Sequence, residues 1–204
     1  MTVDESAARG RPRDPRTDRD IMAATRRLLA EDGYDQLSIE SIAKAAGVSR
    51  PTVYRRWPSK AHVVFDAAFG EPPPTEFPPQ TGDFDTDLHT FVTAALAFWN
   101  DPVVEAAALG ILTERHRTPD LHIRTQQLLD ERTLTGFRSL VRGGIEQGAV
   151  APDVDVGTFY QVLIGTTFYH AQLGGPAAHD LAERLCALVI QGIRATPTRK
   201  QDHR

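Results

Sequence analysis

Side chains suited to contact with nucleic acid are concentrated in one short stretch, residues 49–60. Guanidinium and hydroxyl groups donate hydrogen bonds to phosphate oxygens, and guanidinium groups also read the edge of guanine. Val53 is apolar and is expected to face the protein core, which leaves its polar neighbours to face outward. The side chains expected to face outward are Arg50, Thr52, Tyr54, Arg55 and Arg56. Together they form a cationic face that predicts contact with double-stranded DNA.

Two short helices joined by a tight turn are predicted to hold this face. Apolar residues of the first helix recur at helical spacing, so one side of it is apolar. These residues are Ile39, Ile42, Ala43 and Ala46. Gly47 ends that helix where a turn needs positive φ. Ser49 is suited to cap the second helix, with Pro51 in its first turn. The stretch therefore predicts a helix-turn-helix.

The composition is that of an ordinary soluble domain. The chain has 204 residues, of which 41% are hydrophobic and 25% are charged. Cys186 is the one cysteine, so it cannot form an internal disulfide and is expected to be a small core residue. The sequence shows no secretory signal and no apolar run long enough to span a bilayer. These features favour a protein of the reducing cytoplasm with no membrane partner.

The net charge of −4 argues against nucleic acid as a partner, but the distribution of charge reverses this conclusion. Residues 1–70 contain 12 basic and 10 acidic residues, whereas residues 71–204 contain 11 basic and 17 acidic residues. Within residues 9–60 the balance is 12 basic to 7 acidic. A basic N-terminal part on an acidic body indicates that only this part meets phosphate.

An all-α head and a linker are predicted at the N-terminal side of the chain. Residues 1–17 are rich in Arg, Pro and Gly and are expected to be a disordered basic arm. Residues 18–70 are expected to form the head, with a first helix at about 17–31, then the helix-turn-helix, then a fourth helix from Lys60 to about Phe69. Residues 71–82 contain five prolines, which exclude a helix and mark a linker.

A larger helical bundle is predicted for residues 83–195, followed by a disordered tail at 196–204. Apolar stripes and helix-start signals identify its helices. They are expected at about 84–99, 102–112, 119–148, 156–173 and 177–194. Asp101 and Thr118 each precede a proline, as an N-cap residue before a first helical turn. With the head, this makes about nine helices and no convincing strand.

Several residues of the head fall at the positions of a known motif. They are Gly33, Tyr34, Ala43, Gly47, Val48, Thr52, Tyr54, Trp57 and Lys60. Through them residues 20–69 resemble the TetR family of one-component transcriptional regulators. The resemblance extends more weakly to residue 194, and residues 148–176 resemble the body of many actinobacterial-type members. It implies an all-α homodimer whose heads bind DNA and whose bodies hold an effector pocket and the dimer interface.

The resemblance also implies roles for single residues of the head. Those that would approach base edges are Arg50, Pro51 and Thr52. Those that would bind phosphates are Tyr54, Arg56 and Lys60. Ser38, which caps the first helix of the motif, and Ser49 and Arg55 complete the expected DNA-binding set. Glu40 departs from the family pattern, because it occupies a position where members can carry a basic residue; it would repel phosphate or accept from a cytosine amine.

A second basic element lies in the N-terminal arm. Arg9, Gly10, Arg11 and Pro12 resemble the core of an AT-hook, in which arginines of an extended arm enter a narrow minor groove. The alternative is a disordered tail that serves solubility, since several aspartates follow closely. The sequence leaves both interpretations open.

No catalytic or metal-binding pattern is recognised, so the chain is not expected to be an enzyme or to need a cofactor. A nucleophile elbow, a phosphate loop and a dinucleotide fingerprint are all missing from the sequence. His116 and His122 are six residues apart, and His170 and His179 straddle a turn. Neither spacing suits a zinc site, and metal is rejected.

Most aromatic residues of the body are expected to lie in its core. Phe168, Tyr169 and His170 are adjacent on one helix and cannot all face one way, so at least one must face a pocket or a partner subunit. With Trp99, these three residues form the candidate wall of a ligand pocket. The last two helices mix small and apolar residues, which predicts that they form the seam of the homodimer.

The sequence therefore predicts a ligand-responsive repressor that reads a palindromic operator as a homodimer and is released by a small molecule. One alternative is an activator or a ligand-independent regulator of the same fold. A remoter alternative is a small-molecule-binding or enzymatic helical protein whose head has lost its DNA function. The intact basic recognition helix and the lack of a nucleophile–base pair disfavour that last alternative.

Overall fold

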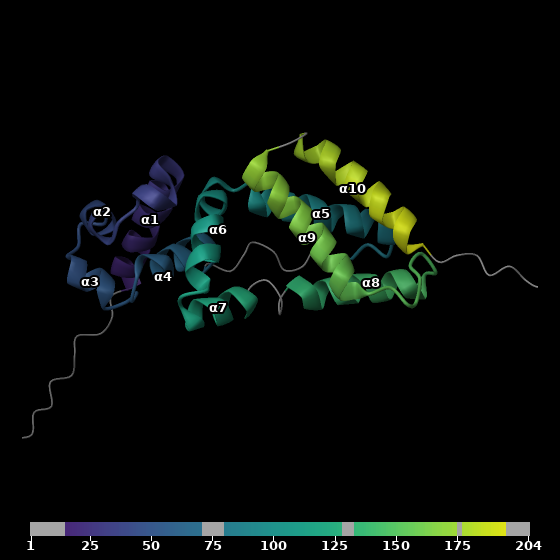
Figure 1. The fold of residues 1–204 in the computed structure, drawn as a ribbon, viewed down its shortest axis with the longest axis horizontal. Coiled ribbons are helices and arrows are strands. Elements are labelled where there is room, and N and C mark those ends of the chain that lie inside the picture. Colours follow the sequence, from purple (N-terminus) through teal and green to yellow (C-terminus); the bar gives the residue numbers. More distant parts are fainter. Residues whose placement is uncertain (1–14, 71–79, 128–132, 175–176, 195–204) are drawn as a thin grey trace, which may run out of the picture.

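The computed structural model of the chain is an elongated assembly of helices (Figure 1). It describes residues 15–70, 80–127, 133–174 and 177–194. Within these ranges there are ten α-helices, one π-helical turn and no strand, so the all-α prediction is confirmed. The stretch predicted as one helix at 119–148 contains two helices, which accounts for the additional one; residues 128–132 between them lie outside the described residues.

The head consists of four α-helices and the π-helical turn. They are α1 (Pro15–Gln36), α2 (Ile39–Ala45), α3 (Arg50–Tyr54), α4 (Lys60–Phe65) and η1 (Asp66–Gly70). Residues 15–17 are helical, so α1 begins inside the predicted disordered arm. Gly33, with a φ of 77°, interrupts the helical backbone of α1 near the predicted stop. Gly47 has a φ of 66° in the turn between α2 and α3, as the turn requires.

The body consists of six helices, of which α9 and α10 both pack against α5, and α9 also contacts α8 (Figure 1). They are α5 (Phe84–Trp99), α6 (Pro102–Arg115), α7 (Pro119–Gln126), α8 (Thr133–Glu146), α9 (Val156–Leu173) and α10 (Ala178–Ile193). Three of them begin at aspartate N-caps. The side chain of Asp101 accepts from the amides of Val103 and Val104, as predicted, and Asp83 and Asp155 cap α5 and α9 in the same way.

Two large apolar cores hold these helices together. The core of the head continues past the proline-rich segment, because Ala107 and Ile111 of α6 and Leu121 of α7 are buried in the same cluster as Val53. The second core joins α5, α8, α9 and α10 and contains Cys186. Burial raises the pKa of the Cys186 thiol to about 11, which fits a core residue rather than a reactive one. The predicted domain boundaries at 71–82 remain a prediction, since residues 71–79 are outside the described residues.

Among the helices that the structure describes, none is long and apolar enough by itself to cross a bilayer. Helices α5 and α6 meet the criteria of length and composition only as a pair, and they are bent by 79° at their junction.

Candidate DNA-binding surface and effector cavity

The helix-turn-helix is built as its sequence predicts. Ser38 accepts from the amide of Ser41 at 3.0 Å, and the Ser41 hydroxyl lies 3.0 Å from the Ser38 amide, so the two serines form a capping box at the start of α2. Ile42 and Val53 are fully buried between the helices. Val53 therefore fixes the rotation of α3 and decides which of its side chains reach solvent.

The exposed side of α3 carries most of the predicted contact residues. The Arg50 side chain is 56% exposed, and Tyr54 is 47% exposed. Pro51 and Arg55 are also exposed, whereas Thr52 is partly covered. Ser49 stands at the N-cap position, but its hydroxyl lies 2.9 Å from the Thr52 hydroxyl instead of capping a backbone amide. This surface combines guanidinium, phenol and hydroxyl donors on one short helix.

Arg56 does not face outward, contrary to the expectation from its sequence neighbours. Its side chain is only 9% exposed and forms an ion pair with Asp18 of α1. It also donates to the carbonyl of Thr52 at 3.1 Å. The reason is geometric: Arg56 follows the last turn of α3, where the chain turns back toward α1. Its charge is therefore neutralised inside the head.

Arg50 has an acidic neighbour on the other helix of the motif. Its guanidinium lies 3.8 Å from the carboxylate of Glu40 on α2, whose side chain is 76% exposed. An exposed pair of this kind is weak, at about 0–1 kcal/mol, because water competes for both partners. Arg50 is therefore available to a stronger partner such as a base or a phosphate.

Lys60 lies at the start of α4, where it contacts the head's Tyr34. Its ammonium donates to the carbonyl of Tyr34 at 2.9 Å and lies 4.1 Å from the centre of the Tyr34 ring. The same ring packs on Gly110 of α6, where a Cβ would come within 2.4 Å of it. Burial, followed by the charges of Glu114 and Asp35, raises the pKa of Tyr34 to about 12. Tyr34 thus connects the body to the lysine predicted to bind phosphate.

The basic arm with Arg9 and Arg11 lies outside the described residues.

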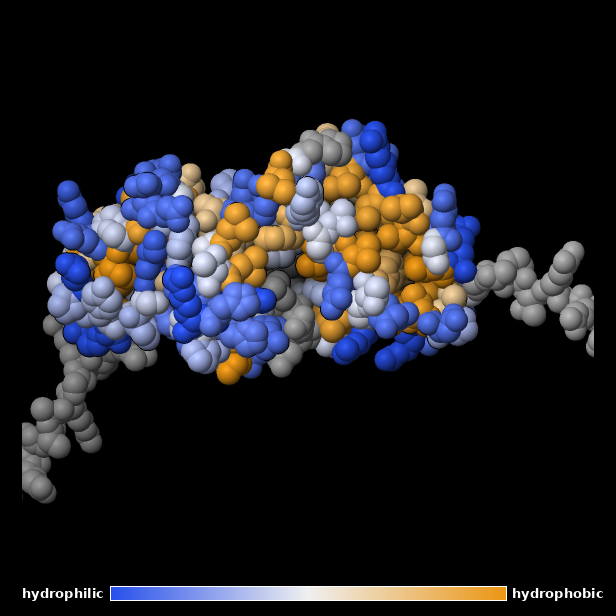
Figure 2. All heavy atoms as spheres, viewed as in Figure 1, coloured by the Kyte–Doolittle hydropathy of each residue, from blue (hydrophilic) through white to orange (hydrophobic). Residues whose placement is uncertain are grey.

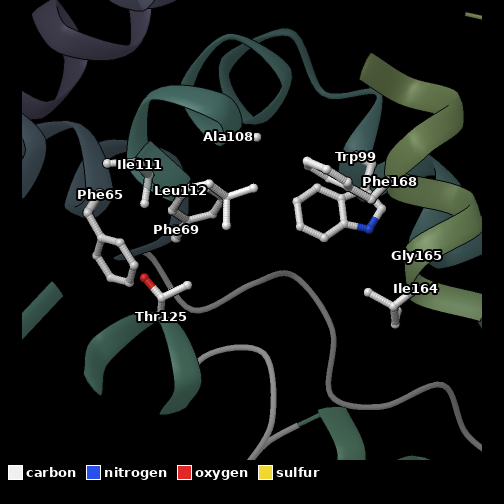
Figure 3. A pocket seen from close by; sticks show the side chains of 10 residues that line it. All are labelled: Phe65, Phe69, Trp99, Ala108, Ile111, Leu112, Thr125, Ile164, Gly165 and Phe168. Carbon is white, nitrogen blue, oxygen red and sulfur yellow. The ribbon is translucent and has the colours of Figure 1, made fainter. Parts of the chain in front are cut away.

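A cavity of about 190 Å³ lies between the head and the body (Figure 3). Ten residues from several helices line it. They are Phe65, Phe69, Trp99, Ala108, Ile111, Leu112, Thr125, Ile164, Gly165 and Phe168. The structure thus brings the predicted residues Trp99 and Phe168 to one wall, with ring centres 5.1 Å apart.

Tyr169 and His170 do not line this cavity, contrary to the expected ligand wall. Successive helical residues point about 100° apart, so Phe168 and its two neighbours diverge. Tyr169 is 64% exposed on the outer side of α9. Phe65 and Phe69, which form the opposite wall in Figure 3, were not predicted from the sequence. Their spacing of four residues at the end of the head was the signal, because it places two rings on one side of the helix.

Polar contacts tie α4 and η1, which carry these two phenylalanines, to α7. His62 is buried, with its Nε2 2.9 Å from the carboxylate of Asp120 and its Nδ1 2.8 Å from the hydroxyl of Ser59. Asp66 accepts from Trp57 at 2.7 Å and forms an ion pair with Arg124. The end of the head is therefore fixed to the helix that supplies Thr125 to the cavity.

Large hydrophobic side chains are exposed on the outer surface of α9 and α10. Figure 2 shows hydrophobic atoms gathered over these two helices. The large exposed hydrophobic residues there are Val162, Tyr169, Leu173 and Leu188. On α9 they recur at helical spacing and form one stripe. Within the described part of the chain, no group of three or more His, Cys, Asp or Glu side chains could hold a metal ion.

The chain matches two family models that together span most of its length. Residues 21–67 match "Bacterial regulatory proteins, tetR family", and residues 78–189 match "Tetracyclin repressor-like, C-terminal domain". Among curated proteins, it is 28% identical to the uncharacterized HTH-type transcriptional regulator YdeS of Bacillus subtilis over 92% of this chain and 95% of YdeS. It is 26% identical to the DNA-binding transcriptional repressor TetR of Mycobacteroides abscessus, over 81% of this chain and 87% of that protein.

The fold is also that of a solved regulator. The structure of FadR from Bacillus subtilis in complex with stearoyl-CoA superposes with a TM-score of 0.66, at 20% identity, over 86% of this chain and 99% of FadR. The family and the relatives are transcriptional regulators rather than enzymes, and the helix-turn-helix is their DNA-binding element. The chain belongs to the TetR family of DNA-binding transcriptional regulators.

Proposed function

We propose that this protein is a repressor that binds a palindromic operator as a homodimer and releases it when a small molecule enters the cavity. The observation that carries the proposal is the exposed polar side of α3, which the buried Val53 turns outward. The protein would act in the cytoplasm, where the operator and a metabolite-sized effector meet.

The exposed residues of the head are expected to contact two different parts of the DNA, the base edges and the phosphates. Arg50, Pro51 and Thr52 begin α3 and would approach base edges in the major groove. Tyr54, Arg55 and Lys60 would contact phosphates, together with Ser38 and Ser49 at the helix starts. Arg56 is assigned to holding α1 against α3, because its charge is already paired.

Two copies are needed to read a palindrome, and the apolar outer surface of α9 and α10 offers the contact. Exposed hydrophobic residues that form a stripe on neighbouring helices are typical of a subunit interface. The two recognition helices would then enter successive major grooves, with centres about 34 Å apart. Any change in that separation would weaken both contacts at once.

On the effector side, the cavity wall includes part of the head. Phe65 and Phe69 belong to α4 and η1, which follow directly after the helix-turn-helix. A ligand that fits only when these rings move would favour a conformation whose heads are wrongly spaced. Release requires this difference in affinity between the two conformations, since tight binding by itself shifts no equilibrium.

An activator or a ligand-independent regulator would share the DNA-binding surface but not the response to ligand. The deciding experiment begins with selection of bound sequences from a random DNA pool by the purified full chain. The expected result is a palindrome, which then serves as the probe in a screen of compounds for release. Recovery of unrelated sequences, or of none at low salt, would contradict the proposal.

Two substitutions test the division of roles on the selected operator. Lys60→Ala is expected to weaken operator and random DNA alike and to lower the slope of log K against log salt by about one. Arg50→Ala is expected to cost about 1–3 kcal/mol on the operator and to relax specificity at one base position. Fluorescence anisotropy at several salt concentrations measures both effects. Arg142→Ala on α8 is the control, and identical behaviour of Lys60→Ala and Arg50→Ala would refute the assignment.

A further inference from the structure

The chemistry of the cavity wall restricts the ligand class, given the ligand response proposed above. Among the described residues that line it, none carries a charge, and Thr125 is the only one whose side chain ends in a hydroxyl. That hydroxyl donates to the carbonyl of Leu121 at 2.7 Å, so its proton is already in use. A charged group that lost its hydration in this cavity would find no oppositely charged partner among these described residues.

The size of the cavity sets a second limit. At about 190 Å³ it is larger than an apolar protein cavity of about 150 Å³ that binds benzene. It is smaller than the pockets of about 300–1,000 Å³ that hold drug-sized ligands. One substituted ring or two fused rings therefore fit the available space.

The arrangement of the wall favours a flat ring over a flexible chain. Phe65 and Phe69 lie on one side of the cavity, and Trp99 and Phe168 lie on the other (Figure 3). Aromatic pairs gain energy from offset and edge-to-face contacts. A rigid ring also loses less conformational freedom on binding than an alkyl chain does.

We propose that the cavity binds an uncharged aromatic compound of one or two rings, inserted between the phenylalanines of the head and the aromatic wall of the body. Gly165 of α9 is an exposed residue that lines the cavity. A Cβ there would have no atom within 4 Å, so a larger side chain at this position has room to compete with the compound.

Two pairs of probes of matched shape test the ligand class. Ethylbenzene is compared with 4-ethylbenzoate, and naphthalene with 2-naphthoate, by isothermal titration calorimetry on the full-length protein; decanoate represents an alkyl chain. The neutral member of each pair is expected to bind at least about 100-fold more tightly, because the described lining residues offer a desolvated carboxylate no charged partner. Tighter binding of a carboxylate or of decanoate would overturn the proposal, as would no binding of either neutral probe.

Substitutions of residues that line the cavity test whether the probe binds there. Gly165→Leu is expected to weaken naphthalene binding at least about 10-fold by occupying the open space. Gly143→Leu on α8, where a Cβ would meet only the ends of two glutamine side chains, is the matched control and should bind naphthalene normally. Leu112→Ala, which widens the wall, should admit anthracene. Circular dichroism and light scattering confirm that the variants keep the fold and subunit number. Equal naphthalene binding by both glycine variants would overturn the site.

Fluorescence anisotropy of the selected operator shows whether a bound probe also releases DNA. It therefore tests the ligand class and the ligand response independently. Naphthalene that binds in the cavity and leaves DNA bound would support the ligand class and contradict the ligand response. Release of DNA by decanoate or 2-naphthoate, with no binding of the neutral probes, would support the ligand response and overturn the ligand class.

Discussion

Two arginines of the same cationic stretch have opposite surroundings. Arg50 is 56% exposed beside a solvated carboxylate, whereas Arg56 is 9% exposed and paired with Asp18. Desolvation makes the second charge dependent on its partner, since an unpaired charge in a low-dielectric site is costly. Residue type indicated that both arginines are suited to bind DNA. Only their burial and their partners show that Arg50 is available to DNA, whereas Arg56 has a structural role.

The Arg56 pair gives a prediction for stability. Asp18→Asn is expected to lower the free energy of unfolding by about 1–3 kcal/mol, because the guanidinium keeps its burial and loses its counter-charge. Urea unfolding measures the loss. Asp20→Asn, an exposed aspartate on the same helix, is the control and should change stability little.

The same pair separates a structural role from DNA contact. Arg56→Gln should leave the salt slope of DNA binding unchanged in the fraction of protein that is folded. A fall in the slope of about one, as for the loss of a phosphate contact, would show that Arg56 leaves Asp18 when DNA binds.

At the scale of helices, start signals were readable because they are local. The Asp101 cap and the prolines after Asp101 and Thr118 require only neighbouring residues, and the structure has helices starting at both places. The division of the 119–148 stretch and the π turn after Phe65 were not predicted. The π turn carries Asp66, whose partners Trp57 and Arg124 are distant in sequence or on another helix, so local periodicity gives no sign of it.

The cap of α9 leads to a prediction about pH. Hydrogen bonds from the amide of Thr158 hold the pKa of the Asp155 carboxyl below its usual value. Because the folded-state pKa is lowered, this carboxylate stabilises the protein above about pH 4, and its contribution is lost as the pH falls further. Asp155→Ala should lower the Tm more at pH 7 than at pH 3. Asp155→Asn, which keeps an N-cap acceptor, should remain close to wild type at pH 7; an equal loss in both variants would contradict the cap.

The contact between α6 and the head leads to a prediction about packing. Gly110→Ala is expected to destabilise the protein by about 1–3 kcal/mol, because the new methyl group overlaps the Tyr34 ring. Operator affinity should also fall, since Lys60 lies on that ring. Gly143→Ala on α8 has room for a methyl group and should instead stabilise by up to about 1 kcal/mol through helix propensity. Urea unfolding compares the two, and equal effects would contradict the close contact.

At the scale of the molecule, the family and the all-α fold were predicted from the sequence, but the cavity was only half predicted. Phe168 was predicted because it and its two neighbours cannot all face one core, and Trp99 was added from another helix, whereas Phe65 and Phe69 come from the head. The head and the body share a core through α6 and α7, so a cavity between them depends on packing that no single segment encodes. Residues brought together from distant segments are the part that sequence patterns cannot supply.

The exposed hydrophobic residues on α9 and α10 lead to a prediction about dimer formation. Leu188 is 69% exposed on α10, and Val162 and Tyr169 belong to the exposed stripe on α9. If these helices form the seam of the dimer, Leu188→Glu buries two like charges near the symmetry axis and should give monomers at micromolar concentration. Light scattering measures the mass. Affinity for the full palindrome should fall at least about 10-fold, while affinity for a half-site is retained, because each head is intact.

Ile123→Glu on α7 is the matched control for this prediction, since Ile123 is 52% exposed but lies away from α9 and α10. It should leave both the mass and the palindrome affinity unchanged. A dimer that survives Leu188→Glu, or one that Ile123→Glu disrupts equally, would place the seam elsewhere. Loss of half-site binding in Leu188→Glu would instead mean that the substitution unfolds the body, which the unfolding curve would reveal. A folded monomer that still binds a half-site would therefore identify this interface. In that case the contacts of each head with DNA are intact, and only the pairing of the two heads has been lost.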